Sequence, residues 1–305
     1  MQTVGRFAPS PSGRMHLGNV LCALLAWLSA RHQNGAFLLQ IEDLDAMRCP
    51  RSYADLIMDD LRWLGLDWDG EVPYQSERAP IYEKYEQILR EKGLLYPCFC
   101  SRAALHAASA PHLSDGRVLY AGTCRELTPA EIEEKRKKRA PATRVRVPDE
   151  IISFTDGVFG AYSENLAEEC GDFIIRRSDG VFAYQLAVTV DDGLLGVTEV
   201  VRGSDLISST PRQIWLYRLF GFEPPHFVHI PLLCDVDGRR LSKRDEDLDL
   251  GLLRERFTPE QVIGALAFAA HLTDRAEPAS VRELVQDFDW SRIPRHELCL
   301  PPMFR

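Results

Sequence analysis

The first 41 residues constrain the fold most, because their pattern predicts a strand, a turn, a helix and a second strand in quick succession. Residues 3–8 predict a short buried strand, and the Pro- and Gly-bearing segment 9–13 predicts a turn. Residues 17–30 predict a helix with leucines repeated along one face, and residues 36–41 predict the next strand. Two strands joined by a crossover helix indicate a parallel sheet.

The pattern changes along the chain and indicates four parts. We expect an α/β fold: a doubly wound parallel, Rossmann-type sheet split by an insertion, with a small helical C-terminal part. The expected parts are a first half of a nucleotide-binding domain at 1–95, an insertion at 96–170, a second half at 171–245 and a helical region at 246–305. Further expected strands are 173–176, 197–202 and 227–233, and further helices 53–64, 81–92, 131–139, 212–220 and 259–271.

Composition excludes some classes of protein. With 36 Lys and Arg against 45 Asp and Glu, the net charge is −9, which excludes a uniformly basic nucleic-acid coat but not a local basic face. The longest apolar runs span nine residues, whereas a membrane helix needs ~20, and no apolar signal segment follows Met1. We therefore expect a soluble, cytoplasmic chain that binds no membrane and acts as a monomer.

Two segments indicate a phosphate-binding site. The segment 9–19 joins the first strand to the first helix, and a helix N-terminus after such a turn attracts anions. His16 there is a donor toward a phosphate oxygen, and Gly18 permits close approach of a ligand. The segment 238–245 carries four basic residues that neutralise charge on pyrophosphate. Taken alone, the first segment is explained equally well by a capped helix, and the second is explained better by a solvated basic loop.

A third set of residues fits a small dicarboxylic amino acid. Arg6 and Arg202 offer guanidinium groups for carboxylates, Glu42 and Tyr184 suit an ammonium group, and Ser10 adds a hydrogen bond. We expect these residues at the carboxyl ends of strands, where an open α/β sheet binds its ligands. Taken singly, each residue is more commonly part of a surface ion pair or a strand-end cap.

Together, these motifs resemble those of the class I aminoacyl-tRNA synthetases. His16-Leu17-Gly18-Asn19 resembles the HIGH signature, with Asn19 in place of the second His. The segment 240–244 resembles KMSKS, with Arg240 in place of the first Lys. The resemblance implies that His16, Gly18, Asn19 and Lys243 bind ATP together with Mg²⁺, and that His16 and Lys243 are catalytic.

The surrounding segments resemble the glutamate branch of that class. They are Arg6-Phe7-Ala8-Pro9-Ser10-Pro11, residues 41–45, residues 184–188 and Val201-Arg202-Gly203. The resemblance covers about residues 3–250 and assigns Arg6, Ser10, Glu42, Tyr184 and Arg202 to glutamate binding.

A cysteine cluster indicates a metal site within the insertion. Cys98, Cys100, Tyr120 and Cys124 have the spacing C-x-C-x19-Y-x3-C. Zinc favours tetrahedral thiolate sites, but three thiols leave a fourth ligand open, and buried free thiols remain an alternative. His106 and His112 are the more ordinary candidates for that ligand. Short paralogues of the glutamate branch carry a zinc site of this spacing, and the resemblance therefore implies Tyr120 and one structural Zn²⁺ per chain.

The basic helix expected at 131–139 suggests contact with RNA. With Arg144 and Arg146, seven of twelve residues are basic, which suffices for a phosphate-contacting patch. The alternative is a solvated helix, since its acidic residues come first and its basic residues last, as the helix dipole favours.

The length beyond residue 245 separates two functions. A full glutamyl-tRNA synthetase carries a long anticodon-binding region there, whereas 60 residues follow Asp245. The chain thus resembles the short paralogues, which activate L-glutamate with ATP and attach it to queuosine in the anticodon of tRNA(Asp). A truncated synthetase that charges tRNA(Glu), a catalytically silent paralogue that binds tRNA or senses glutamate, and another nucleotidyltransferase are the alternatives.

Overall fold

A four-stranded parallel sheet lies at the centre of the structure, a computed structural model that describes residues 2–101, 119–235 and 249–304. Its strand order is β2-β1-β8-β9. The strands are β1 (Val4–Phe7), β2 (Ala36–Leu39), β8 (Glu199–Gly203) and β9 (His226–Ile230). The order reverses between β1 and β8, which confirms the expected parallel α/β sheet and locates its ligand crevice at their carboxyl ends.

Helices cover both faces of this sheet because successive side chains of each strand point in opposite directions. On β8, Val201 belongs to the core around α1 (Leu17–His32), and Val200 belongs to the core around α6 (Tyr184–Leu194) and α7 (Thr210–Phe220). The first core also contains residues of α2 (Arg51–Trp63), and the second contains residues of α3 (Ala79–Glu91).

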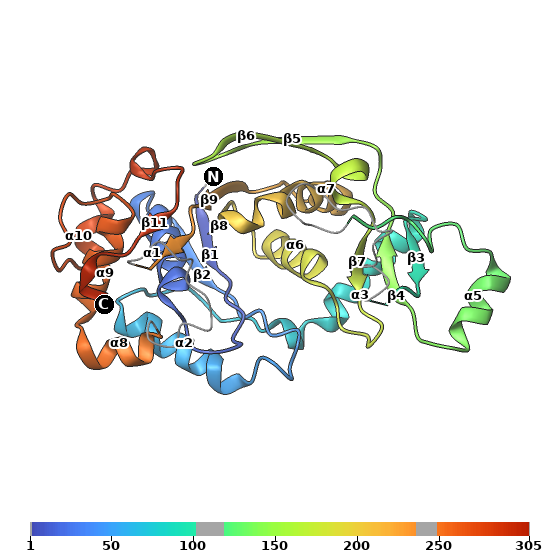
Figure 1. Cartoon of the computed structure of the whole chain (residues 1–305), viewed down its shortest axis with the longest axis horizontal. Coiled ribbons are helices and arrows are strands. Elements are labelled where there is room, and N and C mark those ends of the chain that lie inside the picture. Colours follow the sequence, from blue (N-terminus) through green and yellow to red (C-terminus); the bar gives the residue numbers. More distant parts are fainter. Residues whose placement is uncertain (1, 102–118, 236–248, 305) are drawn as a thin grey trace.

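The insertion is more regular than the sequence suggested. Strands β3 (Leu95–Cys98), β4 (Ala142–Val145) and β7 (Phe173–Arg176) form an antiparallel sheet, and α5 (Pro129–Arg136) lies beyond it at one end of the molecule (Figure 1). We expected β7 in the second half of the nucleotide-binding domain, but it pairs with β4. Strand β4 was not predicted from the sequence, because its third residue, Arg144, is a charged residue that the structure buries.

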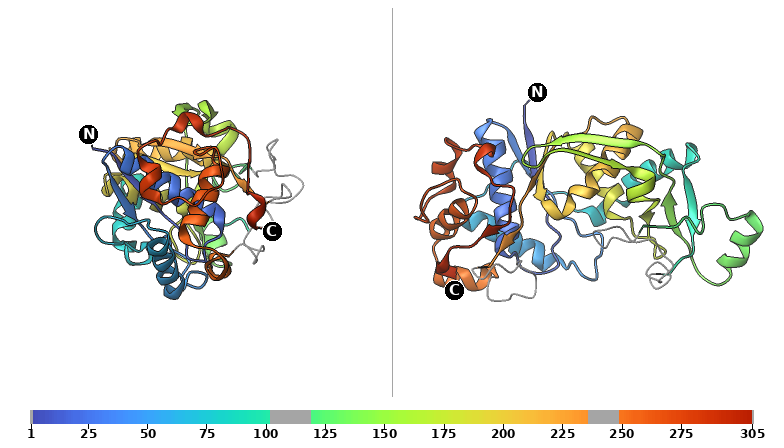
Figure 2. Two further views of the ribbon diagram at one scale, coloured as in Figure 1. Left: turned by 90° about the vertical axis from the view of Figure 1, so that its left-hand side faces the viewer. Right: turned by 45° about the horizontal axis from the view of Figure 1, so that its top comes forward.

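A long hairpin links the insertion to the parallel sheet. Strands β5 (Ile151–Asp156) and β6 (Gly160–Asn165) pair antiparallel, and β5 packs against α7 and β9. Figure 2 shows the hairpin crossing over α7 toward the centre of the molecule. A segment of the insertion thus reaches the main sheet.

The C-terminal part packs against α1 at the opposite end from α5 (Figures 1 and 2). It contains α8 (Leu250–Arg256), α9 (Pro259–Ala269) and α10 (Val281–Val285). Its last segment forms β11 (Leu298–Cys299), which pairs in parallel with β10 (Leu233–Cys234). Across the three described ranges, no helix is both long enough and apolar enough to cross a membrane.

Candidate active site and metal cluster

One cavity of about 640 Å³ opens at the carboxyl ends of β1 and β8, where the strand order reverses. It brings together every expected ligand-binding residue that the structure describes: Arg6, Ser10, His16, Gly18, Asn19, Glu42, Tyr184 and Arg202. Tyr184 is the one whose local setting differs from expectation, because it begins helix α6 and does not end a strand. A common cavity is what a single ligand site requires.

Arg6 is already engaged by a carboxylate of the chain. Its Nε lies 3.2 Å from Oδ1 of Asp192, and its Nη1 donates to the carbonyl of Val201 at 3.3 Å. Both charged groups are buried, at 4% and 2% exposed. Asp192 therefore orients the Arg6 guanidinium and offsets its charge. The sequence did not predict that Asp192 holds Arg6, because no local pattern indicates this long-range pair.

Arg202 has a different environment, because the hydrogen bonds described for it go to neutral groups. Its Nη1 donates to Oε1 of Gln213 at 2.7 Å and to the Tyr184 hydroxyl at 3.4 Å. Its Nη2 donates to Oγ1 of Thr210 at 2.7 Å, and its Nε donates to Nε2 of His229 at 3.0 Å. Among the described residues, no carboxylate forms an ion pair with this buried guanidinium. A buried cation held by neutral dipoles is suited to an anionic ligand.

Glu42 lies half-buried in the same cavity. Its Oε2 accepts a hydrogen bond from the Ser10 hydroxyl at 3.3 Å. Burial raises the pKa of Glu42 to about 8, because it outweighs the opposing effect of the Arg6 charge. The carboxyl group is therefore poised to ionise when a positive ligand group arrives.

His16 caps α1, and two neighbours hold its ring and backbone. Its Nδ1 accepts from the backbone N–H of Gly18 at 3.1 Å, so a neutral ring carries its proton on Nε2. Its backbone N–H donates to Oδ1 of Asn19 at 3.4 Å. Asn19, where the HIGH signature has its second His, therefore completes the helix cap.

These contacts change the expected role of the helix N-terminus. The N–H groups of Gly18 and Asn19 both bond to His16, at 3.1 and 2.9 Å, and are not available for a phosphate without rearrangement. A Cβ at position 18 would lie 2.9 Å from Cε1 of His16. Gly18 thus makes room for the imidazole ring itself.

The second phosphate-binding motif lies outside the described residues. Lys243 and Arg240 both fall within the range 236–248. The described chain resumes at Asp249, which forms an antiparallel bridge with His16. Asp249, the first described residue after that range, therefore lies beside the N-terminus of α1.

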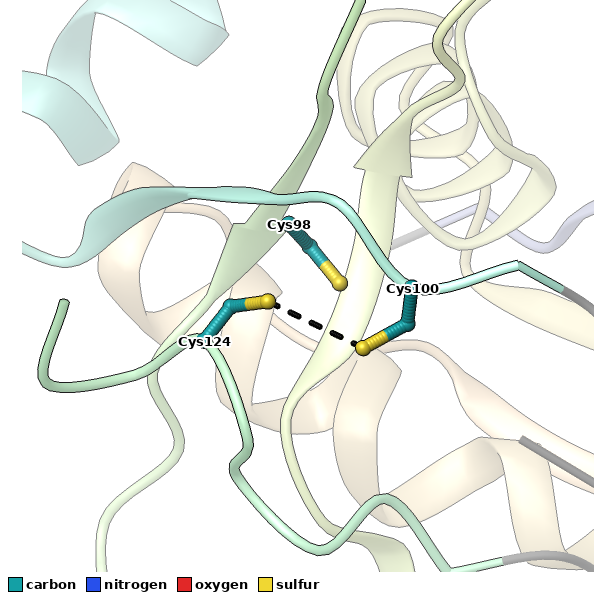
Figure 3. Close-up of side chains that lie close together, drawn as sticks. All are labelled: Cys98, Cys100 and Cys124. Carbon is teal, nitrogen blue, oxygen red and sulfur yellow. Dashed lines mark hydrogen bonds between the residues drawn. The ribbon is translucent and has the colours of Figure 1, made fainter. Parts of the chain in front are cut away.

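The three cysteines of the insertion converge on a single point (Figure 3). The Sγ atoms of Cys98, Cys100 and Cys124 all lie within 4.8 Å of one another. Those of Cys100 and Cys124 are 3.7 Å apart, and the Tyr120 hydroxyl lies 3.6 Å from Sγ of Cys98 and 4.0 Å from Sγ of Cys100. Zn–S bonds of about 2.3 Å give a tetrahedral sulfur separation of about 3.8 Å, so this donor set has the size of a zinc site. His106 and His112 lie outside the described residues.

Arg144 supplies a positive charge to this cluster. Its Nε lies 3.2 Å from Sγ of Cys98, and its guanidinium carbon lies 3.7 Å above the ring of Tyr120. Burial raises the pKa of the Cys98 thiol, but the backbone N–H of Cys100 and the Arg144 charge outweigh it, so this pKa is below its ordinary value. The contacts favour a thiolate, the form that binds metals.

The expected basic patch is therefore smaller than the sequence suggested. Arg144 is buried beside the cysteines, and Arg146 pairs with Glu126 at 2.6 Å. Just after α5, the C-cap residue Lys137 and the following Lys138 are exposed and pair loosely with Glu134, at 3.5 and 3.3 Å. Those two lysines remain candidates for a phosphate contact.

Comparison with known proteins identifies the family. Residues 2–291 match the family described as class I tRNA synthetases (E and Q), catalytic domain. The chain is 49% identical to a glutamyl-Q tRNA(Asp) synthetase of Symbiobacterium thermophilum, over 97% of this chain and 95% of that protein. It is 46% identical to one of Nitratidesulfovibrio vulgaris, with the same coverage of both chains.

A solved structure agrees with these relatives. The glutamate tRNA ligase of Elizabethkingia meningosepticum, in complex with its amino acid, superposes with a TM-score of 0.84 at 28% identity. The match covers 100% of this chain and 68% of the ligase. The chain therefore belongs to the class I glutamyl and glutaminyl tRNA synthetase family, in the group of glutamyl-Q tRNA(Asp) synthetases.

Proposed function

We propose that the chain activates L-glutamate with ATP and transfers it to the queuosine base in the anticodon of tRNA(Asp). The observation that carries the activation step is the buried Arg202, a cation with neutral partners, in one cavity with Glu42 and His16. The names of the closely similar relatives support the choice of acceptor.

The charges of the cavity suggest how glutamate lies in it. Arg202 binds the side-chain carboxylate of glutamate, since no carboxylate of the described chain neutralises the Arg202 charge. Glu42 and Tyr184 receive the ammonium group, with Ser10 holding the Glu42 carboxyl group. Arg6 is already paired with Asp192 and lines the cavity near these groups. Its positive charge attracts the α-carboxylate of glutamate.

Activation then requires little covalent chemistry from the protein. The α-carboxylate attacks the α-phosphorus of ATP in line, which forms glutamyl-adenylate and releases pyrophosphate. Catalysis is positioning plus stabilisation of charge on the phosphates. His16 donates from Nε2, Gly18 and Asn19 hold that ring and the helix entrance, and Lys243 neutralises the departing pyrophosphate, with Mg²⁺ bound to ATP. A hydroxyl of the queuosine cyclopentene ring attacks the mixed anhydride and releases AMP.

We also propose that Cys98, Cys100, Tyr120 and Cys124 bind one structural Zn²⁺. The separations of their donor atoms fit a tetrahedral ion, and Arg144 compensates the thiolate charge. The metal would fix the loop around Cys124 to β3, and no step of the reaction involves it.

The test is transfer of labelled glutamate, with ATP, to three purified tRNAs. We expect label on tRNA(Asp) containing queuosine and none on the same tRNA with unmodified guanosine or on tRNA(Glu). Label on tRNA(Glu) would instead make the chain a minimal glutamyl-tRNA synthetase. No glutamate-dependent pyrophosphate exchange would indicate a silent paralogue. We also propose that the chain acts as a monomer in the cytoplasm, where ATP and tRNA are both present.

A further inference from the structure

A buried chain of three side chains connects the insertion hairpin to the cavity. Asp156 ends strand β5 in the turn of the hairpin, and its Oδ2 lies 2.6 Å from Nδ1 of His229 on β9. Nε2 of His229 lies 3.0 Å from Nε of Arg202 on β8. Asp156, His229 and Arg202 are 3%, 0% and 5% exposed, so solvent does not replace these contacts.

The contacts assign one tautomer to His229. The Asp156 carboxylate only accepts hydrogen bonds, so Nδ1 of His229 carries the proton and donates it. The guanidinium of Arg202 only donates, so Nε2 must present its lone pair. Oδ2 of Asp156 also accepts from the backbone N–H of His229 at 3.0 Å, which fixes the carboxylate beside the ring.

The protonation states agree with this assignment. Burial and the Arg202 charge lower the pKa of His229, and together they outweigh Asp156, so the ring stays neutral. Burial raises the pKa of Asp156, but His229 and the backbone N–H of Phe159 outweigh it, so the net pKa is lowered and the carboxylate stays ionised. A protonated His229 would point an N–H at the Arg202 cation and break the contact.

We propose that His229, held in its Nδ1–H tautomer by Asp156, is a positioning residue that orients Arg202 for the side-chain carboxylate of glutamate. The Nε contact holds one edge of the guanidinium, while Gln213 and Thr210 hold the two Nη groups. The proposal rests on the proposed binding of glutamate, and it gives the hairpin of the insertion a part in substrate selection.

Two substitutions at position 229 separate positioning from packing. His229→Asn keeps a polar group near Nδ1 and loses the acceptor for Arg202, whereas His229→Gln carries an acceptor near Nε2. Since a hydrogen bond to a charged group is involved, we expect His229→Asn to raise the KM for glutamate about 10-fold to 100-fold in pyrophosphate exchange. We expect the KM for ATP to stay within about twofold and His229→Gln to restore much of the glutamate affinity. His229→Asn should also discriminate less between glutamate and glutamine.

His226→Asn is the matched control, because His226 lies on the same strand, is 53% exposed and pairs with Glu199. We expect it to leave both KM values unchanged. An active His229→Asn enzyme with an unchanged KM for glutamate would overturn the proposal. So would equal increases for glutamate and ATP that His229→Gln does not reverse, since they indicate a packing defect.

A measurement on the unmodified chain tests the proposal even if the variants at position 229 do not fold. Nitrogen-15 spectra of the histidine side chains distinguish the two tautomers. We expect a slowly exchanging Nδ1–H resonance from a buried ring, and its absence would overturn the proposal. An inactive unmodified enzyme would instead count against the proposed function, which keeps the two failures distinct.

Discussion

The backbone N–H of Leu250 donates to the carbonyl oxygen of Met15 at 3.1 Å. The residue after Met15 is His16, and Leu250 begins α8 just after the range that contains Lys243. A main-chain contact therefore joins the residue before the motif that resembles HIGH to the first residue of α8. Side chains reinforce it, because Arg14 and Arg254 both bind the buried Asp60 of α2.

We predict that Asp60→Ala destabilises the protein by about 3–5 kcal/mol, since it leaves two arginines near a vacated buried site. Asp60 is fully buried and lies 2.8 Å from both Arg14 and Arg254. Asp59→Ala is the control, because the exposed Asp59 forms an ion pair with Arg254 only, among the described residues, and should contribute at most about 1 kcal/mol. Urea unfolding measures both free energies, and equal losses would contradict the prediction.

Lys243→Ala should slow glutamate-dependent pyrophosphate exchange roughly 10²–10³-fold, equivalent to ~2.7–4 kcal/mol of barrier, because one donor to the phosphates is lost. The KM for glutamate should change little. The exposed Lys92 at the end of α3 provides a control, and Lys92→Ala should retain full activity. A loss below tenfold for Lys243→Ala would remove this residue from the proposed mechanism.

Glu42 should make glutamate activation depend on pH. Its pKa is raised to about 8 by burial, so the free enzyme carries the neutral acid below that pH and the carboxylate above it. Only the carboxylate attracts an ammonium group, so kcat/KM for glutamate should rise with pH through about 8. Because the pKa of Glu42 is raised in the folded protein, its contribution to folding stability is present at low pH and is lost as pH rises through about 8.

Glu42→Gln should abolish that rise and increase the KM for glutamate while leaving the KM for ATP nearly unchanged. The matched control is Glu71→Gln, an exposed residue outside the cavity. The measurement is the pH profile of kcat/KM for each variant. A profile for Glu42→Gln that rises as in the parent enzyme would assign the titration to another group.

Metal analysis of chelator-washed protein should find about one zinc per chain, since the four donors form one tetrahedral set. Cys124→Ser should lose the metal, and Tyr120→Phe should hold it more weakly in competition with a chromogenic chelator. Removing the metal should also lower stability, because a structural site forms only in the folded chain. Cys170→Ser in the same region is the control and should retain zinc, since Cys170 donates to the Gly171 carbonyl and not to the cluster. Protein without tightly held zinc would contradict the proposed site.

Charge reversal at Lys137 and Lys138 tests whether α5 contacts RNA. If both lysines neutralise phosphates, the double change to Glu should weaken tRNA binding and reduce the slope of log K against log salt by about 1–2. Lys84→Glu with Lys92→Glu on α3 makes the same change in net charge elsewhere. An unchanged slope in the α5 variant would mean that these lysines are only solvated.

The elements with strong periodic patterns were predicted closely from the sequence. The helix expected at 17–30 is α1 at Leu17–His32, and the strand expected at 173–176 is β7 with the same bounds. The pairing of strands was harder to predict, since the hydrophobic pattern of a strand indicates which side chains are buried and not which strand lies beside it. That is why β7 was assigned to the wrong sheet and β4 was missed where a buried Arg144 interrupts its apolar pattern.

The candidate site shows the same division. The order of the motifs was enough to predict that Arg6, Glu42 and Arg202 belong to one site, and the structure brings them into one cavity. The groups that hold them were not found, since nothing in the local sequence distinguishes His229 or Asp156 from other residues of their type. Their contacts with one another and with Arg202 join three strands and exist only in the folded chain.

The pairing of β10 with β11 has a consequence for how the protein is made. Strand β10 directly precedes the range that contains Lys243, yet its parallel partner lies at Leu298–Cys299. During translation, α1 and the strands of the main sheet leave the ribosome well before that partner does. Strand β10 therefore stays without its parallel partner until residues 298–299 emerge, so this pairing forms after the main sheet can already have assembled.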